Sequence, residues 1–195
     1  MTSATAGRQN QRTRTRKDLL DAASRLLKQG LKLTVEEVAA EAMVSRATAY
    51  RYFPNVDMLV AEVTLEWAMP DPADIFLGAP DDPVERLIRV DDALTGMMKA
   101  NESAFRTMLA QSLQAGGGDY PVRANRRTAL IEEALTPARD RLRPADLQSL
   151  MSAVAVFIGV ESMVVFTDVL RIEESRAREA RRWAIRALVE AALTE

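Results

Sequence analysis

Residues 33–53 constrain the fold of this chain most, because they predict two short helices joined by a tight turn. Thr34 is a favourable N-cap residue, and Glu37 three residues later completes a capping box. The apolar residues that follow recur at the spacing of one buried helical face: Val35, Val38, Ala39 and Ala42. Ser45 is a second N-cap residue and opens the next helix. Each of the two helices therefore carries its own start signal.

The second of these helices has an unusual outer face. Val44, Ala49 and Phe53 are expected to point inward. The residues left largely outward are Arg46, Ala47, Thr48, Tyr50, Arg51 and Tyr52. A merely solvated face would carry Lys and Glu, whereas arginine pairs with guanine O6 and N7, and tyrosine and threonine hydroxyls donate to phosphate oxygens. This face predicts a DNA major groove as its partner.

The flanking segments agree with this interpretation. Residues 1–17 hold five basic residues and no acidic one: Arg8, Arg12, Arg14, Arg16 and Lys17. Such a stretch cannot bury a core, so we expect a disordered basic tail that contacts phosphates. An amphipathic helix then stops at Gly30, and another starts near Asn55, carries Trp67 inward and ends before Pro70. We therefore place a domain of helix-turn-helix type at residues 18–66.

The run from Leu20 to Val63 resembles the DNA-binding domain of the TetR/AcrR family. Its end carries much of the likeness: Ala47, Thr48, Ala49, Tyr50, Arg51, Tyr52, Phe53, Pro54 and Asn55. The resemblance implies a homodimeric, ligand-responsive transcriptional regulator, most often a repressor. It implies that the residues touching the DNA backbone are Thr34, Thr48, Tyr50 and Tyr52. Those facing the bases, from the helix that Ser45 opens, are Arg46, Ala47 and sometimes Arg51.

Two positions depart from the family pattern. The turn residue is usually Gly, and here it is Met43, so a residue with a Cβ must adopt a conformation that Gly enters freely. The family also commonly places a Lys at the start of the fourth helix, where this chain has Val56. Val56 cannot supply the charge that this lysine brings to a phosphate, and the basic tail is a candidate to replace it.

The charge distribution favours an N-terminal nucleic-acid contact although the formal net charge of the chain is −2. Residues 1–66 contain ten Lys and Arg against eight Asp and Glu, whereas the remainder contains 16 against 20. The positive charge is thus concentrated where the DNA-facing helix is predicted.

The chain contains no cysteine and no histidine. This excludes disulfides, thiolate nucleophiles, zinc sites built from imidazole or thiolate, and a Ser-His-Asp triad. No pair of acids stands out, so we predict no catalytic residue, no metal site and no cofactor. The longest apolar run, residues 150–170, is interrupted by Ser152, Glu161 and Asp168, which favours a buried helix over a membrane span. With no apolar signal core at the N-terminus, the cytoplasm is the expected location.

Residues 67–195 are predicted to form a larger helical domain for ligand binding and dimerisation. After a connector at residues 71–80, helices are expected from Asp81 or Asp82 onward and at about 103–115, 122–135, 144–169 and 174–193. The fold class is all-α, with about nine helices and no strand.

The last two helices, at about 144–170 and 174–193, are the expected dimer contact. They are rich in small residues, which allow close approach: Ala153, Ala155, Gly159, Ala184, Ala187 and Ala191. The resemblance implies that they pair with their mates in a four-helix bundle, and the alternative is that they only complete the core of one chain.

A ligand site is indicated more weakly. The apolar candidates are Met97, Phe105, Met108, Phe157 and Phe166, which form a pliable lining because methionine adapts to varied shapes. Core packing accounts for each of them equally well. Glu161 interrupts an apolar run, so it either contacts an unknown small-molecule effector or pairs with an arginine such as Arg106 or Arg182.

These observations predict a sequence-specific DNA-binding transcriptional regulator, a repressor that a small apolar ligand releases from a palindromic operator. The partners are double-stranded DNA, the effector and a second copy of the chain, with no membrane. An alternative is a helical binding protein whose N-terminal domain contacts proteins, which predicts weak DNA binding without sequence preference. A third hypothesis is an enzyme, but the sequence shows no arrangement of nucleophile, base or metal ligands that would support it.

Overall fold

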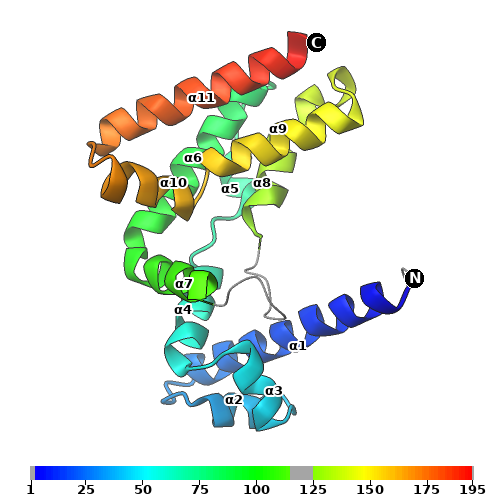
Figure 1. Ribbon diagram of the computed structural model, residues 1–195, viewed down its shortest axis with the longest axis vertical. Coiled ribbons are helices and arrows are strands. Elements are labelled where there is room, and N and C mark those ends of the chain that lie inside the picture. The colour runs from blue at the N-terminus through cyan, green and yellow to red at the C-terminus, as the bar shows by residue number, and fades with distance from the viewer. Residues whose placement is uncertain (1–2, 115–124, 195) are drawn as a thin grey trace. The chain divides into compact units, whose positions relative to one another are not determined.

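The computed structural model describes residues 3–114 and 125–194, which form eleven α-helices, one 3-10 helix and one π-helix (Figure 1). Within those ranges there is no strand, which confirms the all-α prediction, although the sequence indicated about nine helices. The chain divides into two compact units. Unit 1 contains residues 1–68 and 103–123, and unit 2 contains residues 69–102 and 124–195.

Unit 1 is built on the N-terminal helices. They are α1 Ser3–Lys28, α2 Val35–Glu41, α3 Arg46–Tyr52 and α4 Val56–Trp67, joined by most of α7 Glu102–Gln114. Helix α1 packs against α2 and α4, and α2 packs against α3. Their shared core holds Leu19, Leu20, Ala22, Ala23, Leu33, Val35, Val38, Ala39, Ala49, Tyr52, Phe53, Leu59 and Val63. The assignment of α7 to this unit differs from the sequence-based boundary at residue 67, which placed this helix in the C-terminal domain.

Helix α1 differs from the sequence-based expectation of a disordered tail over residues 1–17. In the structure it begins at Ser3, so residues 3–17 are its first turns. The segment contains no proline, and nine of its fifteen residues are Ala, Arg, Gln or Lys, which favour helix. Arg16 also has a structural contact instead of an open phosphate-binding position, because its guanidinium donates to Glu62 of α4 at 2.5 Å and lies 5.3 Å from the Phe53 ring centroid.

Two smaller differences lie at the end of α4 and after it. Trp67 was expected to point inward, yet it is half-exposed, and its indole N–H donates to Ser24 Oγ at 3.0 Å. The predicted connector at residues 71–80 contains a short helix, α5 Pro72–Phe76, whose first turn is capped by Asp71. Pro72 favours this helix because its fixed φ suits the first helical position.

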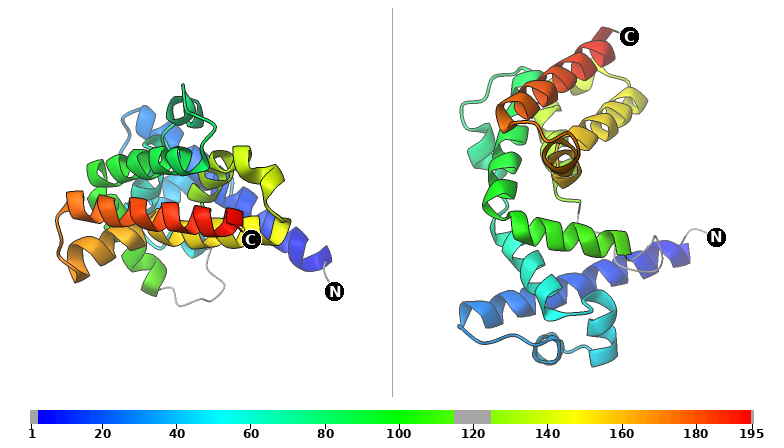
Figure 2. Two further views of the ribbon diagram at one scale, coloured as in Figure 1. Left: turned by 90° about the horizontal axis from the view of Figure 1, so that it is seen from above. Right: turned by 60° about the vertical axis from the view of Figure 1, so that its left-hand side comes forward.

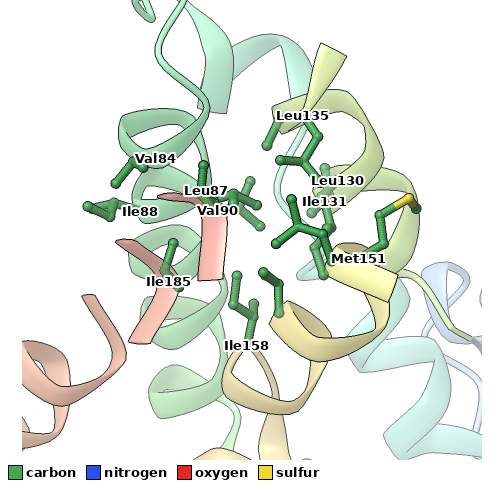
Figure 3. Packing of buried hydrophobic residues seen from close by; sticks show 14 of the residues in the cluster. Val84, Leu87, Ile88, Val90, Leu130, Ile131, Leu135, Met151, Ile158 and Ile185 are labelled. Atoms are coloured by element: carbon green, nitrogen blue, oxygen red, sulfur yellow. The ribbon is translucent and has the colours of Figure 1, made fainter. Parts of the chain in front are cut away.

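Unit 2 is a bundle around a second core (Figure 3). Besides α5, its elements are α6 Pro83–Ala100, α8 Arg127–Ala134, the 3-10 helix Thr136–Arg141, α9 Pro144–Phe157, α10 Val160–Val164, the π-helix Val165–Val169 and α11 Glu174–Thr194. Apolar side chains of α6, α8, α9 and α11 meet in this core, among them Leu87, Ile131, Val154 and Ile185. Helices α9 and α11 lie side by side in both views of Figure 2 and pack directly on each other.

The predicted helix over residues 144–169 is wrong in one respect, because it is broken after Phe157 and bent by 41°. Gly159 has φ 155°, and a Cβ there would lie 1.9 Å from Nη1 of Arg127. That nitrogen donates to the Ile158 carbonyl at 3.2 Å and to Glu161 Oε2 at 2.6 Å. The break thus leaves space for the Arg127 guanidinium of α8, which donates to Ile158 on one side of Gly159 and to Glu161 on the other.

An ion pair is buried between α6 and α11. Nε of Arg181 donates to the two carboxylate oxygens of Asp91 at 3.0 and 2.9 Å, and both residues are almost fully buried. Nη2 of Arg181 also donates to Glu174 Oε1 at 2.9 Å. Burial raises the pKa of Asp91, against the opposing effect of the Arg181 charge. The buried charges of Asp91 and Arg181 therefore offset each other's cost of removal from water.

Within residues 3–114 and 125–194, no single helix is long and apolar enough to cross a membrane. Helix α9 and residues 160–169 together reach that length and apolarity, with the bend of 41° between them. Buried helices of helical bundles also have this composition, and Leu150, Met151 and Val154 of α9 lie in the unit 2 core.

Candidate nucleic-acid interface

Hydroxyl groups fix the starts of α2 and α3. The Thr34 backbone N–H donates to Glu37 Oε2 at 2.9 Å, and the Glu37 N–H donates to Thr34 Oγ1 at 3.1 Å, which confirms the predicted capping box. The Ser45 side chain accepts from the Thr48 N–H at 3.1 Å, and its hydroxyl lies 2.8 Å from Thr48 Oγ1. The start of α3 is therefore set by local bonds within residues 45–48.

The turn between α2 and α3 is made by Met43, as the sequence indicated. Its φ is 54°, in the left-handed region, and its side chain is 92% exposed. Its N–H donates to the Ala40 carbonyl at 3.1 Å, and the Val44 N–H donates to Ala39 at 2.9 Å, the pattern of a Schellman helix end. A residue with a Cβ thus occupies a position that glycine would enter without strain.

Replacing Met43 with glycine is expected to raise the free energy of unfolding of unit 1 by about 0.5–1 kcal/mol. Relief of the left-handed strain outweighs the greater entropy that glycine gives the unfolded chain. Urea denaturation followed by circular dichroism measures this change. Met43→Ala is the matched control, because it removes the exposed side chain but keeps the Cβ. An equal gain in both variants would mean that backbone strain is not the cause.

The outer face of α3 agrees with the sequence-based prediction except at Tyr52. Arg46, Ala47, Tyr50 and Arg51 are exposed, and Thr48 is half-buried. The prediction that Tyr52 points outward is wrong, since only 6% of the residue is exposed. Ala49, Tyr52 and Phe53 are spaced i, i+3 and i+4, so they form one inward stripe on this short helix.

Tyr50 has an internal hydrogen-bond partner that the sequence did not reveal. Its phenol donates to Glu36 Oε1 of α2 at 2.6 Å. This bond is the main cause of two opposite shifts, lowering the pKa of Glu36 and raising the pKa of Tyr50. The charge of Arg46 also acts on both groups. The two partners are 14 residues apart and meet only when α2 and α3 are packed together.

At the start of α4, Asn55 accepts from the Met58 N–H at 2.9 Å and caps the helix. Val56 follows and packs, partly buried, against the unit 1 core. The position that commonly carries a lysine in the resembling family thus contributes apolar packing here.

The candidate ligand residues of the C-terminal region are divided between the units. Phe105 and Met108 lie on α7 in unit 1, whereas Met97, Phe157, Glu161 and Phe166 belong to unit 2. Glu161 is paired with Arg127 of α8. Arg182, one of the arginines considered for it, donates to Asp92 at 2.7 Å instead.

The segment that holds this geometry is similar to a known family. Residues 19–63 match the family described as bacterial regulatory proteins, tetR family. Over this range the chain is similar to that family. The matched range runs from the middle of α1 to α4 and includes the capped α2 and α3. The matched range falls within residues 18–66, where the sequence predicts a domain of helix-turn-helix type.

Three relatives that match over a longer range are named as regulators too. The chain is 36% identical over 112 residues to proteins named uncharacterized HTH-type transcriptional regulators in Mycobacterium bovis and in two strains of Mycobacterium tuberculosis. The match covers 54% of this chain and 49% of each relative, so the chain spans about half the length of the relatives it matches. These names, like the description of the family that residues 19–63 match, are those of regulators.

A crystal structure of HlyIIR, a hemolysin II transcriptional regulator, is also similar at 17% identity. The alignment covers 87% of this chain and 97% of that one, with a TM-score of 0.36.

Proposed function

We propose that the chain is a dimeric transcriptional repressor that inserts α3 into the major groove of a palindromic operator. The observation that carries the proposal is the exposed face of α3, which presents two guanidiniums and a phenol on a helix with a fixed start. Arg46, Ala47 and Arg51 face the bases in this proposal. The phosphate contacts are Thr34, Ser45, Thr48 and Tyr50, whereas the buried Tyr52 supports α3 from behind.

Two exposed stripes support a dimer through α9 and α11. On α11 the outward residues include Trp183, which is 74% exposed, with Ala187 and Ala191 four and eight positions later. On α9 the outward stripe is Ala145, Ser149, Ser152 and Val156. Helices α9 and α11 pack on each other, so these two exposed stripes lie on adjacent helices of unit 2. A second copy related by a two-fold axis would cover them in a four-helix bundle.

Trp183→Glu is expected to shift the protein from dimer to monomer, weakening self-association by at least about tenfold. It removes a large apolar contact of the kind that dominates interfaces and places a charge there. Analytical ultracentrifugation over a concentration series measures the effect. Leu77→Glu is the matched control, because Leu77 is 79% exposed but lies outside α9 and α11. If both variants dimerise as the wild type does, another surface forms the dimer.

We propose that effector binding and DNA binding are thermodynamically linked, so that the effector releases the protein from DNA. A small apolar effector that binds the helical C-terminal region best in a conformation with mismatched α3 spacing would lower DNA affinity without touching DNA. Glu161 is a candidate polar contact for it, since the Arg127–Glu161 pair retains partial exposure, with 25% and 42% of the two side chains accessible. A compound screen on the preformed DNA complex identifies the effector class.

Selection of bound duplexes from a random-sequence pool tests the proposed function. The expected result is a palindrome whose two half-sites lie about one helical turn apart, because each half accommodates one α3. Binding without sequence enrichment would favour the alternative of a protein-contact domain. Enrichment of a single half-site would retain DNA reading by α3 and contradict the dimer.

A further inference from the structure

The Tyr50 phenol has a single hydrogen, and in the structure Glu36 receives it. The 2.6 Å separation lies in the range of a charge-assisted bond between a hydroxyl and a carboxylate. A tyrosine that donates to a carboxylate cannot donate the same hydrogen to a phosphate. The phosphate contact assigned to Tyr50 therefore requires this internal bond to break.

Glu36 is also an anion on the surface that is proposed to face DNA. It lies in the first turn of α2, and Tyr50, which is 42% exposed, reaches it from α3. Helices α2 and α3 are adjacent within unit 1 (Figure 1). The carboxylate thus offers Tyr50 the same kind of oxygen acceptor that a DNA phosphate offers.

We propose that Glu36 is an intramolecular competitor of DNA phosphate for the Tyr50 phenol and so limits the affinity of the domain for every duplex. This inference rests on the proposed function. Because the competition concerns a backbone contact, it acts evenly across sequences and leaves base preference unchanged. The bond also holds Tyr50 beside α2 in the free protein, so that DNA binding begins with an exchange of acceptors.

A double-mutant cycle tests the proposal. Glu36→Gln, Tyr50→Phe and the double variant are titrated by fluorescence anisotropy against the duplex selected by the wild type and against a scrambled duplex. Glu36→Gln is expected to raise affinity for both duplexes by about fivefold, since a neutral acceptor holds the phenol less strongly. Tyr50→Phe alone weakens binding to both duplexes by similar factors.

The coupling between the two positions separates competition from a simple charge effect. Glu41→Gln is the matched control, because it removes one carboxylate from α2 at an exposed pair with Arg25. In the Tyr50→Phe background, the gain from Glu36→Gln is expected to shrink to that of Glu41→Gln. Equal gains from Glu36→Gln with and without the Tyr50 hydroxyl would overturn the proposal.

Two further outcomes are decisive. Loss of affinity for the selected duplex alone in Glu36→Gln would overturn competition and make Glu36 a base-reading residue that accepts from cytosine N4. If wild type and Glu36→Gln bind no duplex at all, the proposed function fails and this inference fails with it. Normal wild-type binding with no gain in Glu36→Gln rejects this inference alone.

Discussion

Replacing Arg181 with methionine is expected to lower the free energy of unfolding of unit 2 by about 3–5 kcal/mol. The substitution leaves the Asp91 carboxylate, which is 1% exposed, without the guanidinium that compensates its charge. The attraction between the partners offsets the cost of removing each from water, so losing one partner exposes that full cost. Urea denaturation followed by far-UV circular dichroism measures the loss.

Two variants separate this mechanism from a simple loss of packing. Asp91→Leu combined with Arg181→Met removes both buried charges and is expected to recover most of the stability. Arg182→Met is the matched control on the next residue, because the Arg182–Asp92 pair is 41% and 37% exposed and should contribute less than about 1 kcal/mol. A double variant no more stable than Arg181→Met would show that an unpaired charge is not the source of the loss.

Arg46→Ala is expected to weaken operator binding by about 1–3 kcal/mol and to relax the preference at one base pair in each half-site. The reason is that a bidentate arginine–guanine contact distinguishes guanine from the other bases. Anisotropy titrations against the selected duplex and single-base variants of it measure both effects.

The control for net charge is Arg139→Ala, which removes an exposed arginine of unit 2 that pairs with Glu132. It is expected to leave affinity and base preference unchanged. If Arg46→Ala keeps the affinity and the selectivity of the wild type, Arg46 is not a base-reading residue.

Features set by neighbouring residues could be predicted from the sequence. The Thr34–Glu37 capping box, the Ser45 cap and the left-handed Met43 each depend on backbone geometry within a few residues, and all three are present. The exposure of Arg46 and Arg51 likewise follows from helical periodicity. Tyr52 could have been placed inward by the same periodicity, since it shares a stripe with Ala49 and Phe53.

Features set by distant residues could not be predicted. The break after α9 depends on Arg127, 32 positions before Gly159, and the apolar pattern of residues 150–170 continues through it. The partner of Asp91 is 90 residues away, and Tyr50 meets Glu36 only across the turn. In each case a side chain that looks unremarkable in the sequence acquires its role from packing between helices.

Methylation interference on the selected duplex tests directly whether α3 reads bases through Arg46. Methylation of guanine N7 blocks the atom to which a bidentate arginine donates. For the wild type, the expected result is interference at a guanine in each half-site, and this interference disappears at that guanine in Arg46→Ala. An interference pattern that is identical for the two proteins would show that Arg46 does not contact guanine N7.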